Sequence, residues 1–229
     1  MIRLHITTEG QTEEKFVNLC LKDHLAAFQV FCDARCVLTS KDTRLHRSYR
    51  GGFCRTQAYQ TVRKDITNWL IEDKSKQCRF STMFDFYGLP QDFPGYTESQ
   101  RITDVYQKIS FLEKSFQDDI GDSRFIPYIQ LHEFETLIFA NPQELDWEYL
   151  EHDNAIEELK RVANSYGNPE LINDGFETSP SKRIIDAIPE HANNKTSGAL
   201  IVQKIGIQLL KRNCQHFCAW LQCLEALNE

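Results

Sequence analysis

The sequence predicts an α/β protein, in which a mainly parallel sheet is flanked by helices and followed by a helical C-terminal part. Short apolar stretches alternate with stretches of helical periodicity over the first 131 residues. This alternation is typical of a parallel sheet with helices on both faces. From about residue 141 onward only the helical periodicity continues. We therefore expect a core over residues 1–140 and a helical extension over 141–229, packed on the core as one unit.

The predicted elements of the core follow one another in a β-α-β order. Apolar residues alternate over 3–7 and predict a first strand, and the acidic stretch that begins at Thr12 predicts a helix. Residues 30–38 predict the second strand and 56–71 the second helix. Residues 80–87 and 124–131 predict two buried strands with a helix at 102–116 between them. Residues 41–50 are rich in Lys and Arg and precede two glycines, which predicts a mobile basic loop.

Helical periodicity is clearest in three segments of the last third, at 154–164, 197–210 and 216–227. The chain has no apolar run near the ~18 residues that cross a bilayer and no signal-peptide pattern. Eight cysteines in such a chain are expected to be reduced thiols, which predicts a cytoplasmic protein. The net charge of −7 argues against broad adhesion to nucleic acid, but a nuclease site built from carboxylates is itself acidic.

Carboxylates recur where the predicted strands end. Glu9 follows the first strand, Asp85 ends the third with Asp92 nearby, and Glu133 and Glu135 follow the fourth. Because parallel strands end at one edge of a sheet, these acids can converge there. Oxygen ligands without His or Cys suit Mg²⁺ or Mn²⁺, which can activate water and bind a phosphodiester. The alternative is that these acids simply avoid burial and cap the following helices.

The turn after the first strand and several later segments together resemble a known family. The segments are 9–13, 85–90, 130–139, 172–174, 179–183 and 214–221. They are similar to the Toprim-like bacterial family catalogued as a domain of unknown function, which includes the nuclease effector of the PARIS anti-phage system. The resemblance covers most of the chain. It implies a Toprim-like fold, a metal-dependent nuclease site, a role in anti-phage defence or a toxin-like system, and an ABC-type ATPase partner.

The resemblance assigns roles to individual acids. Glu9 matches the glutamate of the first Toprim motif, a metal ligand or general acid/base, and Asp85 matches the first acid of the Asp-x-Asp motif. Tyr87 stands where the second Asp is expected, so one usual metal ligand is absent. Glu133 and Glu135 are the candidates to replace it, since positions two apart on a strand share a face.

Other candidates surround these acids. Gly10 allows a sharp turn and the approach of a phosphate. His132 could orient a ligand or contact phosphate, or be structural. The family pattern also places basic residues in the C-terminal part, where they could hold substrate phosphates or lie on a solvated surface: Lys182, Arg183 and Lys195.

Cysteine spacings and nucleotide motifs add little. Cys32 and Cys36, like Cys214 and Cys218, are four residues apart, but small buried apolar side chains explain them better than a zinc site. The sequence contains no phosphate-binding loop of the Gly-x-x-x-x-Gly-Lys-Ser/Thr type, so a partner is expected to bind any ATP involved.

The leading hypothesis is a Mg²⁺- or Mn²⁺-dependent endonuclease that cleaves RNA, including transfer RNA, or DNA. In this hypothesis Glu9, Asp85 and Glu133 carry the reaction. A catalytically silent adaptor that binds an ATPase or nucleic acid is the second hypothesis, supported by Tyr87. Another phosphoryl-transfer activity, such as nucleotide or primer synthesis, is the third. The sequence leaves a homo-oligomer open.

Overall fold

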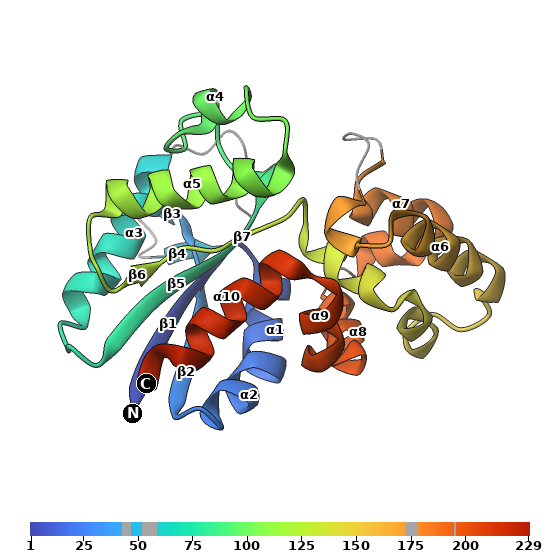
Figure 1. Cartoon of the computed structure of the whole chain (residues 1–229), viewed down its shortest axis with the longest axis horizontal. Coiled ribbons are helices and arrows are strands. Elements are labelled where there is room, and N and C mark those ends of the chain that lie inside the picture. The colour runs from blue at the N-terminus through green and yellow to red at the C-terminus, as the bar shows by residue number, and fades with distance from the viewer. Residues whose placement is uncertain (43–46, 52–58, 173–177, 195) are drawn as a thin grey trace.

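The fold is taken from a computed structural model that describes residues 1–42, 47–51, 59–172, 178–194 and 196–229, with the backbone alone at 39–42 and 47–50 (Figure 1). Five parallel strands form the main sheet: β1 (Ile2–Thr8), β2 (Val30–Cys36), β5 (Cys78–Asp85), β6 (Phe125–Ile126) and β7 (Ile129–Gln130). Their order is β2-β1-β5-β6, and β7 also pairs with β5. The predicted α/β fold with a mainly parallel sheet is therefore confirmed.

Helices cover both faces of this sheet, as predicted. On one face lie α1 (Gln11–Phe16), a π-helical turn η1 (Val17–Leu21), α2 (Lys22–Ala26) and α10 (Gln215–Glu225), which pack on alternate residues of β1. The rings of Tyr128 and Trp220 stack there at 4.2 Å. On the other face α3 (Tyr59–Glu72) and α5 (Val105–Ile120) bury Phe80 and Phe84 of β5. Apolar burial on the two faces is what holds the layers together.

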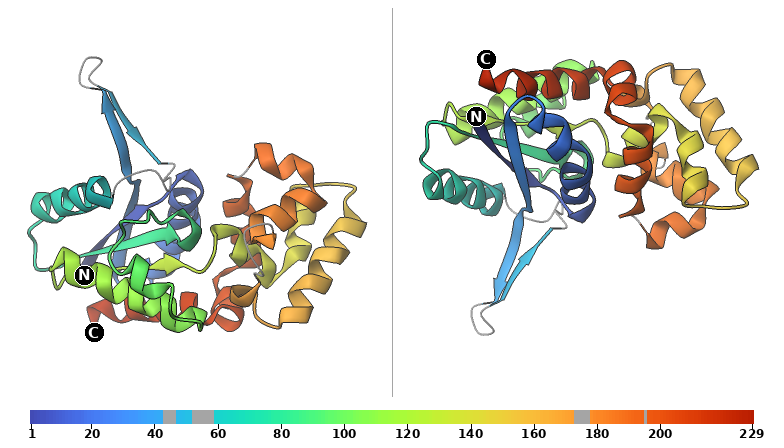
Figure 2. Two further views of the ribbon diagram at one scale, coloured as in Figure 1. Left: turned by 90° about the horizontal axis from the view of Figure 1, so that it is seen from above. Right: turned by 90° about the horizontal axis from the view of Figure 1, so that it is seen from below.

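The predicted basic loop at 41–50 is in part a β-hairpin, so that prediction is wrong over the described residues. β3 (Leu38–Asp42) and β4 (Arg47–Arg50) pair antiparallel. Figure 2 shows this hairpin projecting away from the helices and the main sheet. Its two strands satisfy each other's backbone groups. Apolar residues do not alternate over 41–50, so the sequence carries no strand signal there.

Two predicted elements are interrupted in the structure. The strand predicted at 124–131 is split into β6 and β7 around Pro127, which has no backbone N–H to give to a ladder. The helix predicted at 197–210 breaks at Gly206, whose φ of 81° lies in the left-handed region, so that α8 (Ser197–Ile205) and α9 (Ile207–Asn213) are separate.

The C-terminal third is helical, as predicted. The core also contains η2 (Phe86–Gly88) and a short α4 (Tyr96–Ser99). Beyond them the described residues form η3 (Phe134–Ala140), η4 (Pro142–Trp147), α6 (Asp153–Tyr166), η5 (Pro169–Leu171), α7 (Pro180–Ala187), η7 (Pro189–Asn193) and η8 (Ala226–Asn228). A buried carboxylate in η5 connects this part to α10 and to α5 (Val105–Ile120). Glu170 accepts hydrogen bonds from the backbone N–H of His216 and Phe217, at the start of α10, and from the Tyr106 hydroxyl. No helix among the described residues is both long and apolar enough to cross a bilayer.

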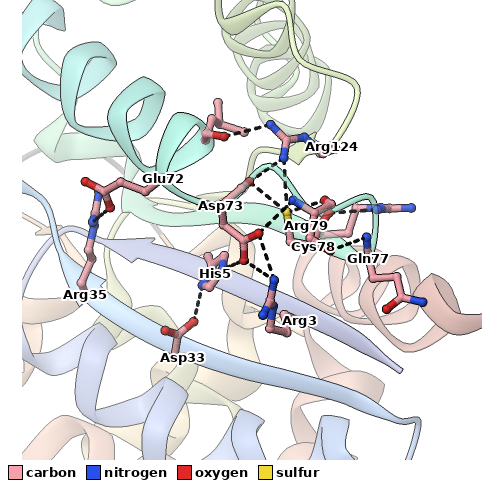
Figure 3. A network of polar contacts seen from close by, with 12 residues as sticks. Arg3, His5, Asp33, Arg35, Glu72, Asp73, Gln77, Cys78, Arg79 and Arg124 are labelled. Atoms are coloured by element: carbon pink, nitrogen blue, oxygen red, sulfur yellow. Dashed lines mark hydrogen bonds and ion pairs between the residues drawn. The ribbon is translucent and has the colours of Figure 1, made fainter.

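A polar network lies beneath α3, on the face of the sheet that carries the odd-numbered residues of β1 (Figure 3). His5 contacts Asp33 at 2.6 Å through Nδ1 and Asp73 at 3.1 Å through Nε2. Burial lowers the pKa of His5, but the hydrogen bonds and charges of both carboxylates outweigh it and raise that pKa overall. This histidine therefore stabilises the fold through its charged form.

Candidate functional site

The carboxyl ends of the neighbouring strands β1 and β5 mark the point from which the chain continues to opposite sides of the sheet. The connection after β1 leads to β2 on one side, and the connection after β5 leads to β6 on the other. Ligands of open α/β sheets bind at such a switch point. Glu9 follows β1 and Asp85 ends β5, and a Glu9 carboxylate oxygen accepts a hydrogen bond from the Asp85 backbone N–H at 2.9 Å. The fold thus brings these two predicted residues together.

The structure adds a third acid that the sequence analysis missed. Glu13 lies in the first turn of α1 and is only 5% exposed. Its Oε2 accepts a hydrogen bond from the Gly10 backbone N–H at 2.7 Å. A glutamate three residues after the helix cap is a known signature of helix starts. This signature accounted for Glu13 in the sequence, so nothing there pointed to a place in the site. Gly10 therefore orients Glu13, in addition to making the turn.

Glu133 and Glu135 reach the same region from the segment after β7, but not from a strand. The strand ends at Gln130, so the expected alternation of a strand does not place these side chains. Instead, Glu133 accepts a hydrogen bond from the Ser181 backbone N–H at 2.9 Å, in the first turn of α7. Glu135 lies in the 3-10 turn η3 and is 7% exposed.

These five carboxylates, which we call the acidic cluster, repel one another. Burial, followed by the charges of Glu13, Glu135 and Glu133, raises the pKa of Glu9 well above its ordinary value. Burial and then the charge of Glu9 raise the pKa of Asp85 in the same way. Burial, with the charge of Glu135 adding to it, raises the pKa of Glu13 to about 7. The cluster therefore accumulates negative charge at a cost to the fold.

No Lys or Arg of the described residues forms an ion pair with any member of the acidic cluster. The His191 imidazole lies beside the cluster, with Nε2 at 3.8 Å from Glu135 Oε1. In addition, Oδ1 of Asp85 is buried and has no hydrogen-bond partner. A buried carboxylate oxygen without a donor is costly, so this atom points to a missing positive or hydrogen-bonding ligand.

Gly88 keeps space open beside Glu9. A Cβ atom at Gly88 would lie 2.6 Å from both carboxylate oxygens of Glu9, closer than atoms can approach. A larger residue would have to displace the Glu9 side chain. In the sequence Gly88 stood out only as part of the segment 85–90, because its contact with Glu9 depends on the packing of two distant segments.

His132 and Tyr87 lie behind the cluster. His132 Nε2 donates to the backbone carbonyl of Glu170 at 3.0 Å, and its own carbonyl accepts from the Tyr87 N–H at 3.1 Å. Burial lowers the pKa of His132 to about 4, so it is neutral near pH 7. A neutral imidazole with a structural hydrogen bond favours the structural role for His132 over contact with phosphate.

The remaining candidates lie in different places. Lys182 and Arg183 lie in α7, and Arg183 Nε donates to the Thr178 carbonyl at 2.7 Å while its guanidinium lines a pocket with residues of α6. Lys195 lies outside the described residues. Both carboxylate oxygens of Asp92 share the hydrogen bond donated by the Tyr59 backbone N–H at the start of α3, so Asp92 caps that helix.

The donor atoms of the acidic cluster suit a hard divalent ion. Among the residues that the structure describes, no three His, Cys, Asp or Glu side chains already converge as an ion site. Mg²⁺ is commonly held by one or two carboxylates and several waters, so a pair such as Glu9 and Asp85 is enough to fit it. The orphaned Asp85 oxygen supplies one such ligand.

The fold and the cluster define an α/β protein with carboxylates gathered at the switch point of its sheet. The chain belongs to the DUF4276 family, described as a domain of unknown function, whose family model matches residues 8–225. Neither the curated proteins nor the solved structures provide a match. The family description says nothing of Toprim proteins, so the resemblance to them stays a prediction.

Proposed function

We propose that this protein is a divalent-metal-dependent phosphodiester hydrolase, an endonuclease acting on nucleic acid. The observation that carries the proposal is the buried, orphaned Oδ1 of Asp85 within a cluster of carboxylates that repel one another. A divalent ion would remove this repulsion. Glu9 and Asp85 would hold the ion, and Glu133 and Glu135 would complete or adjust its surroundings. The bound ion would supply an activated water and neutralise charge on the phosphate.

The other residues of the site support this chemistry. Glu13, whose pKa is raised to about 7, is suited to take up a proton near neutral pH. Gly88 leaves room beside the Glu9 carboxylate. The net charge of −7 disfavours unaided binding to nucleic acid, so a bound cation or a partner would have to offset it. An ABC-type ATPase partner and a role in anti-phage defence are further proposals, and both rest on the resemblance to the Toprim-like family.

Metal binding is tested by thermal unfolding of the wild type, Glu9→Gln and Asp85→Asn with increasing Mn²⁺ or Mg²⁺. An ion that binds the folded state raises its melting temperature, by about 2.7 kcal/mol in stability at 100 times the dissociation constant. We expect both variants to lose this rise. Asp92→Asn is the matched control, because Asp92 caps α3 outside the cluster and its loss should leave the metal effect intact.

Hydrolysis is tested by incubating the same proteins with transfer RNA, other RNAs and DNA, each with Mn²⁺ or Mg²⁺. Cleavage by the wild type and Asp92→Asn, but not by Glu9→Gln or Asp85→Asn, is the expected result. Equal cleavage by all four folded proteins would contradict the proposal.

The second candidate function is a catalytically silent adaptor that binds an ATPase or nucleic acid. Tyr87, at the place of the expected second aspartate, favours it, because the site lacks one usual metal ligand. An adaptor of this kind would show no metal-dependent rise in melting temperature and would keep its partner binding in Glu9→Gln.

A further inference from the structure

A buried histidine from the C-terminal part lies beside the acidic cluster. His191, in η7, is fully buried. Its Nδ1 lies 2.8 Å from the Tyr149 hydroxyl, and that hydroxyl lies 2.8 Å from Ser197 Oγ. Ser197 Oγ in turn lies 2.7 Å from the backbone carbonyl of Asn194. These contacts form one chain of hydrogen bonds that ends at a group able only to accept.

The end of this chain fixes the direction of every bond in it. Because the Asn194 carbonyl can only accept, the single hydroxyl proton of Ser197 is donated to it. Tyr149 must then donate its own proton to Ser197 Oγ, which leaves only its oxygen lone pairs for His191. His191 therefore donates from Nδ1, and the lone pair of a neutral His191 is on Nε2.

Nε2 of His191 is buried and has no hydrogen-bond partner. It lies 3.8 Å from Oε1 of Glu135, a member of the acidic cluster. A histidine that binds a metal through one ring nitrogen usually donates a hydrogen bond from the other, which fixes its tautomer and orientation. His191 has this arrangement before any ion is present.

The separation of the two atoms also suits shared ligation. Two ligands at about 2.1 Å from one ion lie roughly 3.0–3.4 Å apart at octahedral or tetrahedral angles. The observed 3.8 Å exceeds this by about 0.4–0.8 Å, which a rotation of the Glu135 side chain can close. The distance is also too long for a direct hydrogen bond between the imidazole and the carboxylate.

We propose that His191 Nε2 and Glu135 Oε1 bind one divalent metal ion, so that the acidic cluster contains a nitrogen ligand. This inference rests on the proposed function, because it concerns the same cluster, and it adds His191 to the site. Tyr149 is a positioning residue in this arrangement. Imidazole favours Mn²⁺ and other first-row transition ions over Mg²⁺, so the protein should prefer Mn²⁺.

The decisive measurement is pulsed electron paramagnetic resonance of Mn²⁺ bound to the full-length protein. A directly bound imidazole nitrogen modulates the Mn²⁺ spin echo, and isotope-labelled histidine changes that modulation. We expect the nitrogen signal in the wild type and its loss in His191→Asn, whose amide can still donate to Tyr149. His216→Asn, which removes a partly buried histidine elsewhere in the fold, is the control and should keep the signal.

Affinity gives a second measurement that remains informative if His191→Asn folds poorly. Tyr149→Phe removes the acceptor of the Nδ1 proton and should weaken Mn²⁺ binding by about tenfold or more, with a smaller effect on Mg²⁺. Equal weakening of both ions would overturn the proposal.

The outcomes separate this inference from the proposed function. Mn²⁺ that binds with a histidine nitrogen signal supports both. Mn²⁺ that binds through Glu9 and Asp85 without that signal overturns the role of His191 and leaves the proposed metal-dependent activity standing. If no ion binds at all, both are overturned.

Discussion

Replacing Glu13 by Gln should make the metal-free protein more stable at alkaline pH. Burial and the charge of Glu135 raise the pKa of Glu13 from 4.5 to about 7. Below pH 4.5 this carboxyl is protonated in both the folded and the unfolded protein, and its contribution to stability is then fully present. The contribution is lost as the pH rises from 4.5 through the folded-state pKa of about 7. Gln keeps the acceptor for the Gly10 N–H but cannot ionise.

The magnitude follows from the shift in pKa. At about 1.4 kcal/mol for each pH unit between the unfolded and folded values, ionisation of Glu13 costs about 3 kcal/mol of folding free energy above pH 8. Most of that, about 2.5 kcal/mol, is lost between pH 5 and pH 8. The advantage of Glu13→Gln over the wild type should therefore grow by about this amount over the same interval.

Urea denaturation at pH 5 and pH 8, with a chelator present, measures this difference. Exposed Glu98 provides the control, since Glu98→Gln should change stability little at either pH. Saturating Mn²⁺ should reduce the advantage of Glu13→Gln at pH 8, because the ion offsets the same repulsion. An advantage that is equal at pH 5 and pH 8 would refute the electrostatic reasoning.

Three further predictions concern other parts of the fold. Gly88→Ala should abolish the rise in melting temperature caused by Mn²⁺, because the added Cβ would displace Glu9. Gly198→Ala is the control and should keep that rise, since the nearest atom to its added Cβ lies at 3.5 Å. A rise that persists in both variants would contradict the argument. His5→Gln should be less stable than the wild type at pH 5.5, because the raised pKa of His5 stabilises the fold only while the imidazole is charged. The difference in free energy of unfolding, measured by urea denaturation, should be smaller at pH 8.5, and an equal difference at both pH values would contradict this. Glu170→Ala leaves three donors without an acceptor and should cost about 3 kcal/mol or more by the same method, while the residual folded protein still responds to Mn²⁺.

The main sheet was predictable because each of its strands carries its own apolar signal. β1 and β5 lie within one or two residues of the predicted segments at 3–7 and 80–87. The hairpin β3–β4 was not predictable in this way, since its two paired segments carry no apolar alternation. A polar strand of that kind has no periodic pattern that distinguishes it from a loop.

The candidate site was predictable only where it follows the strands. Glu9 and Asp85 come directly after or at the end of strands that the sequence reveals, so their convergence follows from parallel pairing. Glu13 had a sufficient local explanation as an acid in a first helical turn. His191 comes from a 3-10 turn in the C-terminal part, and its approach to Glu135 depends on packing between segments that no local pattern records.

The position of α10 also has a consequence for the order of folding. Trp220 of α10 donates from Nε1 to Ser81 Oγ of β5, across 139 residues of sequence, and its ring stacks on Tyr128. α10 also packs on the face of the sheet that contains Leu4 and Ile6 of β1. β1 is synthesised before the other strands of the sheet. Contacts between such distant segments close large loops and slow folding. During synthesis α1, η1 and α2 can cover part of this face, but the part that α10 covers stays exposed until α10 has left the ribosome. The apolar surface left exposed in that interval favours aggregation of the nascent chain.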